Sequence, residues 1–308
     1  MRIALVGIGD IAQKAYLPII TTLRDVEVVL CSRNAAQLER LAASYRIRQF
    51  TTDIGELASM NIDGAFVHSA TESHASVVCR LLEHGTHVYV DKPLAYTLQE
   101  SERMVALAEA TNRLLLVGFN RRYAPMYEAL ANKTERRIVL MQKNRVGQPD
   151  LARRVVFDDF IHVVDTLRFL APGRIEEVRV SGGICSGRLH HVVLQLEGAG
   201  FNLLGSMNRD SGINEETVEV MSPGNKWRVQ SLSTTTHYHA GSERIVNAGD
   251  WDTVLWRRGF PQIIQHFLDC IRTNSAARQS ARDSLATHAL CEQIVTQLEA
   301  MGATPMEL

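Results

Sequence analysis

The sequence predicts an α/β fold: an amino-terminal doubly wound parallel sheet, then an α+β domain built on a mostly antiparallel sheet. Three observations support this prediction. Short apolar runs alternate with helical segments over residues 1–120, glycines follow the first apolar run, and turn-separated extended segments fill residues 175–250. Strands that alternate with helices of about 10–15 residues indicate βαβ units and a parallel sheet.

The first sheet is predicted from five β-rich runs, Arg2–Val6, Glu27–Leu30, Gly64–Val67, His87–Val90 and Leu114–Val117. The intervening helices are expected near residues 10–23, 35–44, 72–84 and 97–111. Runs such as IALV and LLLV are apolar at successive positions, which is typical of strands covered on both faces. Thr97 and Glu100 form a capping box, and Gly85 is placed to end the preceding helix. Pro18 should end or kink the first helix.

The second half has a different pattern. A helix is expected from Asp158 to Leu170, strands at VVLQLE, GFNLLGSM and TVEVMS, and two amphipathic helices near 260–273 and 282–300. Strands in series with flanking helices predict an α+β domain. We therefore divide the chain into a first domain of residues 1–119 and a second of residues 120–308.

Composition excludes several classes of protein. Lys plus Arg (33) nearly equals Asp plus Glu (34), which argues against a nucleic-acid partner or a polybasic membrane surface. No apolar run approaches the roughly 20 residues that span a bilayer, and the amino terminus does not resemble a signal peptide. The five scattered cysteines include no C-x-x-C pair, which favours reduced thiols and a cytoplasmic location.

The loop after the first strand reads Gly7-Ile8-Gly9-Asp10-Ile11-Ala12, a G-x-G-x-x-A pattern. Its first glycine permits a tight turn, its second lets the backbone approach a pyrophosphate, and the small third position lets helix pack on strand. The following helix offers amide N–H groups to phosphates. Because the loop lies between a strand and a helix inside a βαβ series, it predicts a Rossmann dinucleotide site.

The second strand ends in Cys31-Ser32-Arg33, where NAD-binding proteins usually carry an acidic residue for the ribose diol. Ser32 and Arg33 could instead bind a 2′-phosphate, so NADP is favoured over NAD. The alternative is that Arg33 is a solvated charge.

The strand His87–Val90 runs into Asp91-Lys92-Pro93. Carboxyl ends of parallel strands line the ligand crevice, and a lysine there can stabilise negative charge on a substrate oxygen. Pro93 could carry a cis bond. The alternative for Lys92 is a surface charge.

On the predicted helix, Asp158, His162 and Asp165 are spaced i, i+4, i+7 and share one face. Phe160 and the aliphatic residues occupy the opposite face and should pack on the core. Histidine exchanges a hydroxyl proton well near neutral pH. The alternative is a solvated polar face.

The other histidines carry less weight. His74 lies early in its helix, close to the expected cofactor, and His190 and His191 lie on a predicted strand. His237 and His239 share one face of a predicted strand, but no nearby carboxylate or cysteine completes a set of ligands. No metal is expected. The sequence has no G-x-S-x-G elbow or P-loop, which removes two rival enzyme classes.

Several motifs in order resemble the glucose–fructose oxidoreductase, inositol dehydrogenase and MocA family over essentially the full length. They are GIGDIA, SATESH, HGTHVYVDKPLA, GFNRRYAP and DDFIHVVD. The resemblance implies Lys92 as catalytic lysine, His162 as acid/base and Asp158 as a substrate-site residue. It also implies ten cofactor-binding positions: Gly7, Gly9, Asp10, Ile11, Ser32, Arg33, Ser69, His74, Asp91 and Asn120.

Three features depart from the family pattern. Asp91 replaces the usual glutamate and Phe160 the usual glycine, and Gln148-Pro149-Asp150 lacks the glycine-rich stretch of relatives. These departures lie at positions where the resemblance implies the substrate pocket and the catalytic residues.

The resemblance implies reversible hydride transfer between NADP, or NAD, and a sugar, polyol, cyclitol or related carbonyl compound, by a homodimer or larger homo-oligomer. Two alternatives stay open at this point. One is a dinucleotide-binding sensor without turnover, motivated by Phe160, and the other is an NAD(P)-assisted elimination or hydrolysis.

Overall fold

The structure is a computed structural model that describes residues 1–302. The chain forms two compact units, each described separately below. The first comprises Met1–Gly118 with Phe260–His288, and the second comprises Phe119–Gly259 with the described residues from 289 to 302. A single division at residue 119 would assign residues 260–288 to the second domain, whereas their packing places them in the first compact unit.

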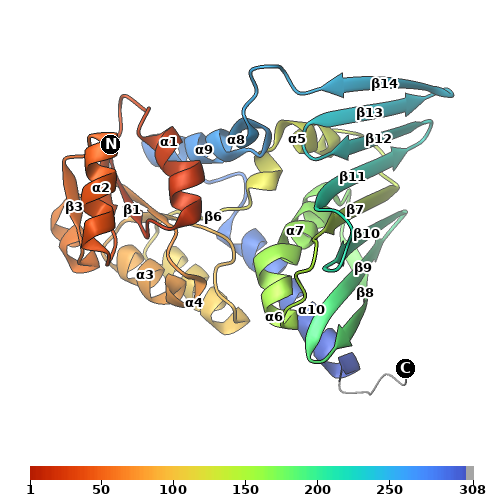
Figure 1. The fold of residues 1–308 in the computed structure, drawn as a ribbon, viewed down its shortest axis with the longest axis horizontal. Helices are drawn as coiled ribbons and strands as arrows, with labels where there is room; N and C mark the ends of the chain where they lie inside the picture. The colour runs from red at the N-terminus through yellow and green to blue at the C-terminus, as the bar shows by residue number, and fades with distance from the viewer. Residues whose placement is uncertain (303–308) are drawn as a thin grey trace. The chain divides into compact units, whose positions relative to one another are not determined.

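The first unit contains a six-stranded sheet in the order β3-β2-β1-β4-β5-β6, and every pairing in it is parallel (Figure 1). The strands are β1 Arg2–Val6, β2 Glu27–Cys31, β3 Gln49–Thr51, β4 Gly64–Val67, β5 His87–Val90 and β6 Leu115–Val117. The predicted doubly wound parallel sheet is confirmed. Strand β3 is not among the predicted strands, because at three residues it is too short to show a pattern.

Helices connect these strands. They are α1 Leu17–Ile20, α2 Ala35–Tyr45, α3 Thr71–Glu83 and α4 Leu98–Ala110. Thr97 Oγ1 accepts from Glu100 N and donates to its carboxylate, which confirms the capping box. Gly85 has φ +77°, as a glycine C-cap requires. The first helix is irregular before Pro18, because a π-helical turn over Ala12–Tyr16 precedes α1.

Aromatic rings form part of the core of the first unit. Phe66 of β4 and Tyr89 of β5 lie with ring centroids 4.9 Å apart. Phe267, from helix α9 (Phe260–Thr273), packs edge-on against both, at 5.0 and 5.8 Å. A carboxy-terminal helix therefore completes the core of the amino-terminal sheet.

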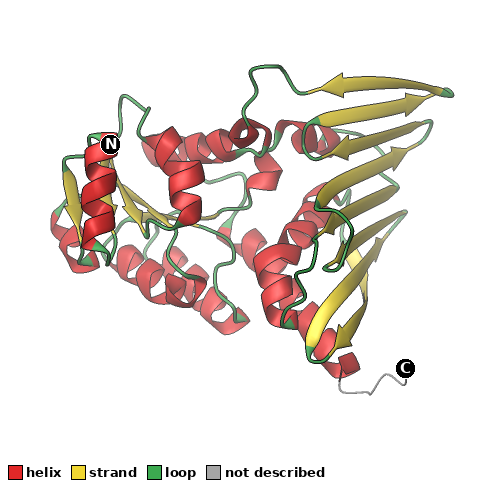
Figure 2. Cartoon of the chain, viewed as in Figure 1, coloured by secondary structure: helices red, strands yellow, loops and turns green. Residues whose placement is uncertain are grey.

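The second unit contains an eight-stranded sheet in the order β14-β13-β12-β11-β7-β10-β9-β8 (Figure 2). Its strands are β7 Ile138–Asn144, β8 Ile175–Cys185, β9 Arg188–Gly198, β10 Phe201–Asn208, β11 Glu215–Ser222, β12 Asn225–Gln230, β13 Thr234–His239 and β14 Ser242–Asn247. Only the β7–β10 pairing is parallel among the described strands of this sheet, so the mostly antiparallel prediction is confirmed.

One face of this second sheet carries helices, as Figure 2 shows. They are α5 Pro125–Ala131, α6 Ala152–Val155 and α7 Ile161–Leu170. Gly205 of β10 fits against α7, because an added Cβ would lie 2.5 Å from Val163 Cγ1. Short helical turns span Ile54–Ser59 in the first unit, and Asn120–Tyr123 and α8 Val254–Arg257 in the second. Helix α10 spans Ala281–Gly302. The amphipathic helices predicted near residues 260–273 and 282–300 are thus confirmed as α9 and α10.

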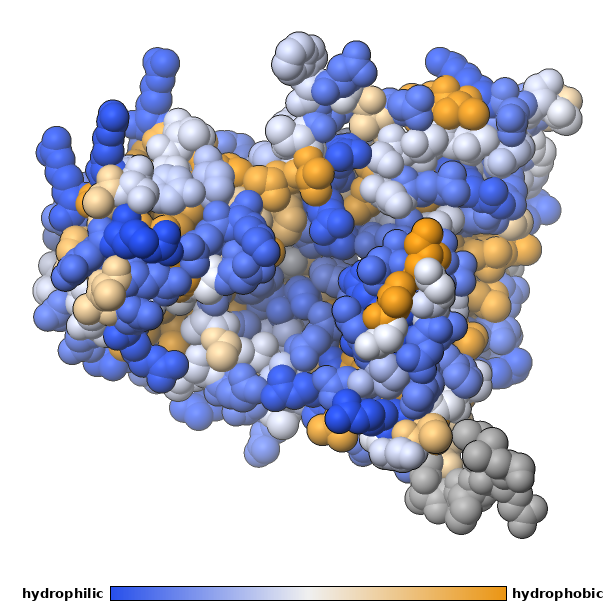
Figure 3. Space-filling model, in the orientation of Figure 1, coloured by the Kyte–Doolittle hydropathy of each residue, from blue (hydrophilic) through white to orange (hydrophobic). Residues whose placement is uncertain are grey.

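The opposite face of the second sheet carries exposed apolar side chains. Ile138 of β7 is 39% exposed and Leu204 of β10 is 36% exposed. In Figure 3, hydrophobic atoms gather along the side of the sheet that faces away from its helices.

The five cysteines are free thiols, and all except Cys185 are buried. Among the described residues, no helix is both long and apolar enough to cross a membrane.

Candidate active site

The glycine loop joins β1 to the irregular first helix. Gly7 has φ +84°, a backbone conformation that side-chain-bearing residues rarely adopt. An added Cβ would lie only 2.5 Å from the backbone nitrogen of Ser69, so the loops after β1 and β4 approach closely at this glycine. At Gly9 the nearest atom to an added Cβ is the His68 carbonyl oxygen, at 3.9 Å, so this position borders open space.

A pocket of about 580 Å³ opens beside this loop, at the carboxyl ends of β1, β2 and β4. Half of the ten predicted cofactor-binding residues line it, namely Gly7, Gly9, Ser32, Arg33 and Ser69. Strand ends at a switch in strand order are where doubly wound sheets bind dinucleotides. The pocket is thus in the position that the glycine motif predicts.

Two further predicted residues lie in the first helical turn after the loop. The Asp10 carboxylate is exposed and pairs with Lys14 Nζ at 2.8 Å. Ile11 is 36% exposed. Neither residue lines the pocket.

His74 is buried and fixes the loop that carries Ser69. Its Nε2 lies 3.0 Å from the Ser69 carbonyl oxygen, and its Nδ1 lies 2.8 Å from that of Pro93. Both partners are acceptors, so each of these contacts is a hydrogen bond where the facing ring nitrogen carries a proton. His74 therefore links the pocket loop to the segment after Lys92.

Asp91 and Lys92 follow the end of β5, and the Lys92–Pro93 peptide is cis, as anticipated. Asp91 Oδ1 accepts a hydrogen bond from the Lys92 backbone nitrogen at 2.9 Å. Burial raises the pKa of the Asp91 carboxyl, while the charges of Lys92 and His74 oppose that rise. Asp91 thus contacts the backbone that carries Lys92.

Two residues outside the predicted set, His68 and Asp53, also line the pocket. His68 is 5% exposed, and neither of its ring nitrogens has a hydrogen-bond partner among the described residues. Burial, together with the nearby His74, lowers its pKa to about 3, so the ring is neutral. His68 directly follows β4, and the rule that strand ends line the crevice could have identified it.

In the second unit, the predicted helix is not uniform. Residues Val156–Phe160 form a π-helical turn between α6 and α7. A wider turn changes the angular spacing of Asp158 from His162, so the i, i+4 argument does not hold across it. The Asp158 side chain is 40% exposed and lies 4.0 Å from Arg154.

His162 and Asp165 are buried, at 8% and 1% exposure. Asp165 accepts two hydrogen bonds from the Arg122 guanidinium, at 2.7 and 2.9 Å. The solvated-face alternative is therefore wrong for these two residues. Phe160 is wholly buried, as the core-facing prediction requires.

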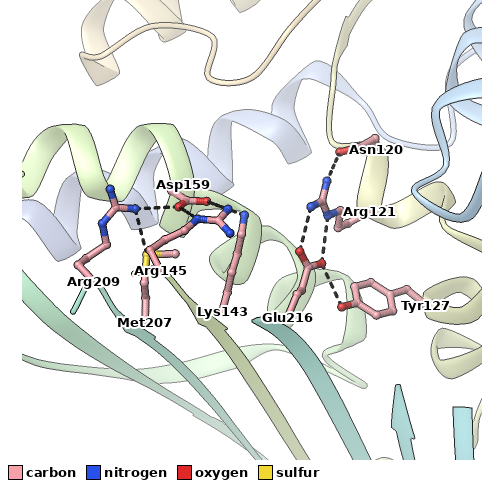
Figure 4. A network of polar contacts seen from close by, with 9 residues as sticks. All are labelled: Asn120, Arg121, Tyr127, Lys143, Arg145, Asp159, Met207, Arg209 and Glu216. Carbon is pink, nitrogen blue, oxygen red and sulfur yellow. Dashed lines mark hydrogen bonds and ion pairs between the residues drawn. The ribbon is translucent and has the colours of Figure 1, made fainter. Parts of the chain in front are cut away.

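Asp159, adjacent to the predicted Asp158, is the centre of a buried ion-pair network. Its carboxylate contacts Lys143 at 2.6 Å, Arg145 at 2.7 Å and Arg209 at 2.8 Å (Figure 4). Burial alone would raise the pKa of Asp159, but Lys143 and Arg145 outweigh this effect and hold it well below its usual range. Burial lowers the pKa of Lys143 to about 8.

A second carboxylate, Glu216 of β11, lies in the same network. It pairs with Arg121 at 2.9 Å and accepts a hydrogen bond from the Tyr127 hydroxyl at 3.1 Å (Figure 4). Burial opposes its ionisation, yet the charge and hydrogen bonds of Arg121 lower its pKa to about 2. Lys143 and Glu216 are direct partners across β7 and β11. The sequence alone does not predict this pair, because the register of β7 against β11 cannot be read from it.

Asn120, predicted to bind cofactor, is engaged at both ends of its side-chain amide. Nδ2 donates to the Arg258 carbonyl oxygen at 2.9 Å, and Oδ1 accepts from Arg121 at 3.2 Å. Asn120 therefore lies beside the ion pair of Arg121 and Glu216 in the second unit.

His237 and His239 do share a strand face, with ring centroids 6.0 Å apart. His237 Nε2 contacts Asn225 Oδ1 at 2.8 Å, and its ring stacks on Trp227. Within residues 1–302, no group of three potential ligands from His, Cys, Asp and Glu could hold a metal ion.

The parallel sheet, its glycine loop and the pocket beside them define a Rossmann dinucleotide-binding protein. Residues 1–119 match the family described as "Oxidoreductase family, NAD-binding Rossmann fold". Residues 125–240 match the family "YceM-like, C-terminal domain".

Similarity to whole proteins extends over both units. YceM from Salmonella typhimurium is 34% identical over 303 residues, which cover 96% of this chain and 97% of that protein. A crystal structure of a dehydrogenase (MviM) from Clostridium difficile superimposes with a TM-score of 0.93 at 34% identity, covering 97% of this chain and 99% of that one. A Gfo/Idh/MocA family oxidoreductase from Vibrio cholerae gives a TM-score of 0.90 at 32% identity, covering 96% and 99%.

The chain belongs to the Gfo/Idh/MocA family of oxidoreductases. The family resemblance inferred from the motifs is confirmed.

Proposed function

We propose that this oxidoreductase is an NAD(P)-dependent dehydrogenase that transfers hydride reversibly between a nicotinamide cofactor and a sugar, polyol, cyclitol or related carbonyl compound. The pocket beside the glycine loop is the observation that carries the proposal. Inositol 2-dehydrogenase 3 from Saccharopolyspora erythraea, 25% identical over 100% of this chain and 96% of its own, supports the substrate class.

The residues of the pocket fit a dinucleotide. Gly7 and Gly9 keep its floor free of side chains, and His68 contributes to its lining. Gly7, Gly9, Ser32, Arg33 and Ser69 would hold the cofactor, with Asp10 and Ile11 contributing through the first helical turn. When bound, the nicotinamide supplies the carbon that accepts or releases hydride.

The chain's own residues would manage the substrate oxygen. His162 removes or returns the hydroxyl proton, and Lys92 donates a hydrogen bond that stabilises charge developing on that oxygen. Asp158, half-exposed on the turn before His162, contacts the substrate. Asp91 and Asn120 complete the proposed cofactor set, and His74 positions the loop at Ser69.

NADP is the favoured cofactor because Ser32 and Arg33 lie together at the end of β2 in the pocket wall. Asp53, the acidic residue in the same wall, already accepts a hydrogen bond from Gly55 N at 2.7 Å as the cap of a helical turn. That bond reduces its capacity to accept from a ribose diol.

Fluorescence titrations with NADPH and NADH test this preference. Arg33→Ala should weaken NADPH binding about tenfold, since a hydrogen bond to a charged group contributes about 1.5–3 kcal/mol, and should leave NADH binding nearly unchanged. Arg24→Ala removes an exposed charge of the same unit outside the pocket and is the control. Equal losses for both cofactors would contradict the 2′-phosphate argument.

Turnover is tested with a panel of sugars and polyols, monitored at 340 nm with each cofactor. Lys92→Ala and His162→Ala should abolish activity while dinucleotide affinity stays within about threefold. Unimpaired turnover in either variant would remove that residue from the catalytic set. Product analysis without net cofactor change would instead reveal elimination or hydrolysis.

A homodimer formed through the exposed sheet face and a cytoplasmic location are part of the same proposal. Ile138 and Leu204 supply apolar surface on that face. Light scattering of wild type and Leu204→Asp tests the dimer, and cell fractionation tests the location. A wild-type monomer would contradict the first, and recovery in the membrane or secreted fraction the second.

A further inference from the structure

The polar network of the second unit is unbalanced in charge. Its two carboxylates are those of Asp159 and Glu216. Five basic side chains contact them or interact with them electrostatically, namely Arg121, Lys143, Arg145, Arg209 and Arg258. With all groups ionised, three positive charges lack a carboxylate within the network.

Most of this charge is removed from water. The side chains of Lys143, Arg121 and Arg209 are 2%, 7% and 10% exposed. Burying cations is costly unless anions compensate them. Asp159 already accepts from three cations, and Glu216 from Arg121 and Tyr127, so neither carboxylate is placed to neutralise more.

The network also has a side that solvent can reach. The Arg145 side chain is 28% exposed, and Arg258 is an exposed residue. Arg258 interacts electrostatically with both Arg121 and Arg145. An incoming anion would therefore meet these two guanidinium groups first, with further positive charge buried behind them.

The network lies next to the proposed acid/base in sequence. Asp159 precedes His162 by three residues, about one helical turn, on the segment that joins the π-turn to α7. Lys143 and Glu216 come from the two central strands β7 and β11. A substrate whose hydroxyl reaches His162 would thus bring its neighbouring substituents toward this excess of positive charge.

We infer that the substrate carries an anionic group, a carboxylate or a phosphate, which the basic side chains around Asp159 and Glu216 bind. The inference rests on the proposed function and narrows its substrate class from neutral polyols to sugar acids or sugar phosphates. Arginine suits this role, because its planar guanidinium binds either oxyanion through paired hydrogen bonds.

Direct binding tests the inference without requiring turnover. Calorimetric titration of the full-length protein, with saturating NADPH and at constant ionic strength, compares gluconate, glucose 6-phosphate and neutral sorbitol. We expect saturable binding of one or both anions and at least tenfold weaker binding of sorbitol. Preference for gluconate assigns a carboxylate, and preference for glucose 6-phosphate assigns a phosphate.

Two variants locate the site. Arg145→Gln removes a partly exposed cation while leaving Asp159 two others, and should weaken anion binding about tenfold or more. Arg179→Gln is the matched control, because Arg179 is 63% exposed on β8 and pairs with Glu177 outside the network. Equal affinity for sorbitol and the anions, or anion binding that survives Arg145→Gln, would overturn the inference.

The same experiments separate failure of this inference from failure of the proposed function. Anion binding that depends on Arg145, without any absorbance change at 340 nm across the panel, would support the anion site and overturn the dehydrogenase proposal. Turnover of neutral polyols as fast as of their acids and phosphates would leave the dehydrogenase standing and overturn the anionic substrate class.

Discussion

The nucleotide pocket of the first unit and the ion-pair network of the second are built in opposite ways. The pocket is lined by residues at successive strand ends, and its glycines contribute by having no side chain. The network consists of long charged side chains that meet across a sheet, with contributions from β7, β11 and the turn before α7 (Figure 4).

The two sites therefore depend on different levels of structure. A strand-end pocket follows from local chain pattern, because parallel strands bring their carboxyl ends to one edge of the sheet. A buried network depends on strand register, which pairs Lys143 with Glu216 and is set by the whole sheet. Substitutions of the two buried carboxylates, Asp159 and Glu216, should therefore act mainly on stability, and substitutions in the pocket mainly on binding.

The largest effect is expected for Asp159→Ala. Removing one partner of a buried ion pair costs about 3–5 kcal/mol, and this carboxylate serves Lys143, Arg145 and Arg209. Asp158→Ala, at the adjacent and 40% exposed position, should cost less than about 0.5 kcal/mol. Urea denaturation of both variants gives the two free energies of unfolding, and similar values would contradict a stabilising network.

A pH dependence of stability should follow from Glu216. Its pKa of about 2 in the folded chain is below the ordinary 4.5, so its contribution is complete above pH 4.5 and is lost as pH falls toward 2. Between pH 6 and pH 3 the loss amounts to roughly 2 kcal/mol. Glu216→Gln should lower stability at pH 6 and flatten this decline in urea midpoints. A decline as steep as that of the wild type would show that other carboxyls cause it.

Gly7→Ala should have a moderate effect on stability and a large one on binding. A side chain at φ +84° costs about 1–3 kcal/mol, and its Cβ would press on the loop at Ser69. Gly9→Ala has space for its Cβ and should keep the wild-type melting temperature. Thermal melts and NADPH titrations compare them, and equal melting temperatures would refute the close approach at Gly7.

The smallest effect is expected for Lys14→Ala. Its partner Asp10 is 77% exposed, and surface ion pairs contribute about 0–1 kcal/mol. If the free energy of unfolding in urea fell by more than about 1 kcal/mol, this surface charge would contribute to stability, and the difference between the two units would not hold.

Most of the fold could be predicted from the sequence because its signals are local. Apolar runs marked β1, β2, β4, β5 and β6, and the cap at Thr97 marked the start of α4. β7 was missed because its residues IVLMQKN end in polar side chains that lie buried at the centre of the sheet. A charged residue in a sequence predicts a position on the surface, whereas Lys143 is only 1% exposed.

The candidate site was predictable only in part for the same reason. Five cofactor positions in the pocket follow from motif and strand-end rules. The π-turn over Val156–Phe160 is not visible in a pattern of i, i+4 spacing, so the spacing does not reveal that Asp159 is the buried carboxylate of this turn. The presence of a helix could be predicted, but its local pitch depends on packing with other elements.

Helix α9 has a consequence for how the protein is made. Its Phe267 packs against Phe66 and Tyr89, and Ile271 lies against Gly64, so the core of the amino-terminal sheet is closed by residues near the end of the chain. When residues 1–118 have left the ribosome during synthesis, this helix has not yet been made. Part of one apolar face of the nucleotide-binding sheet therefore stays uncovered until residues 260–273 have emerged.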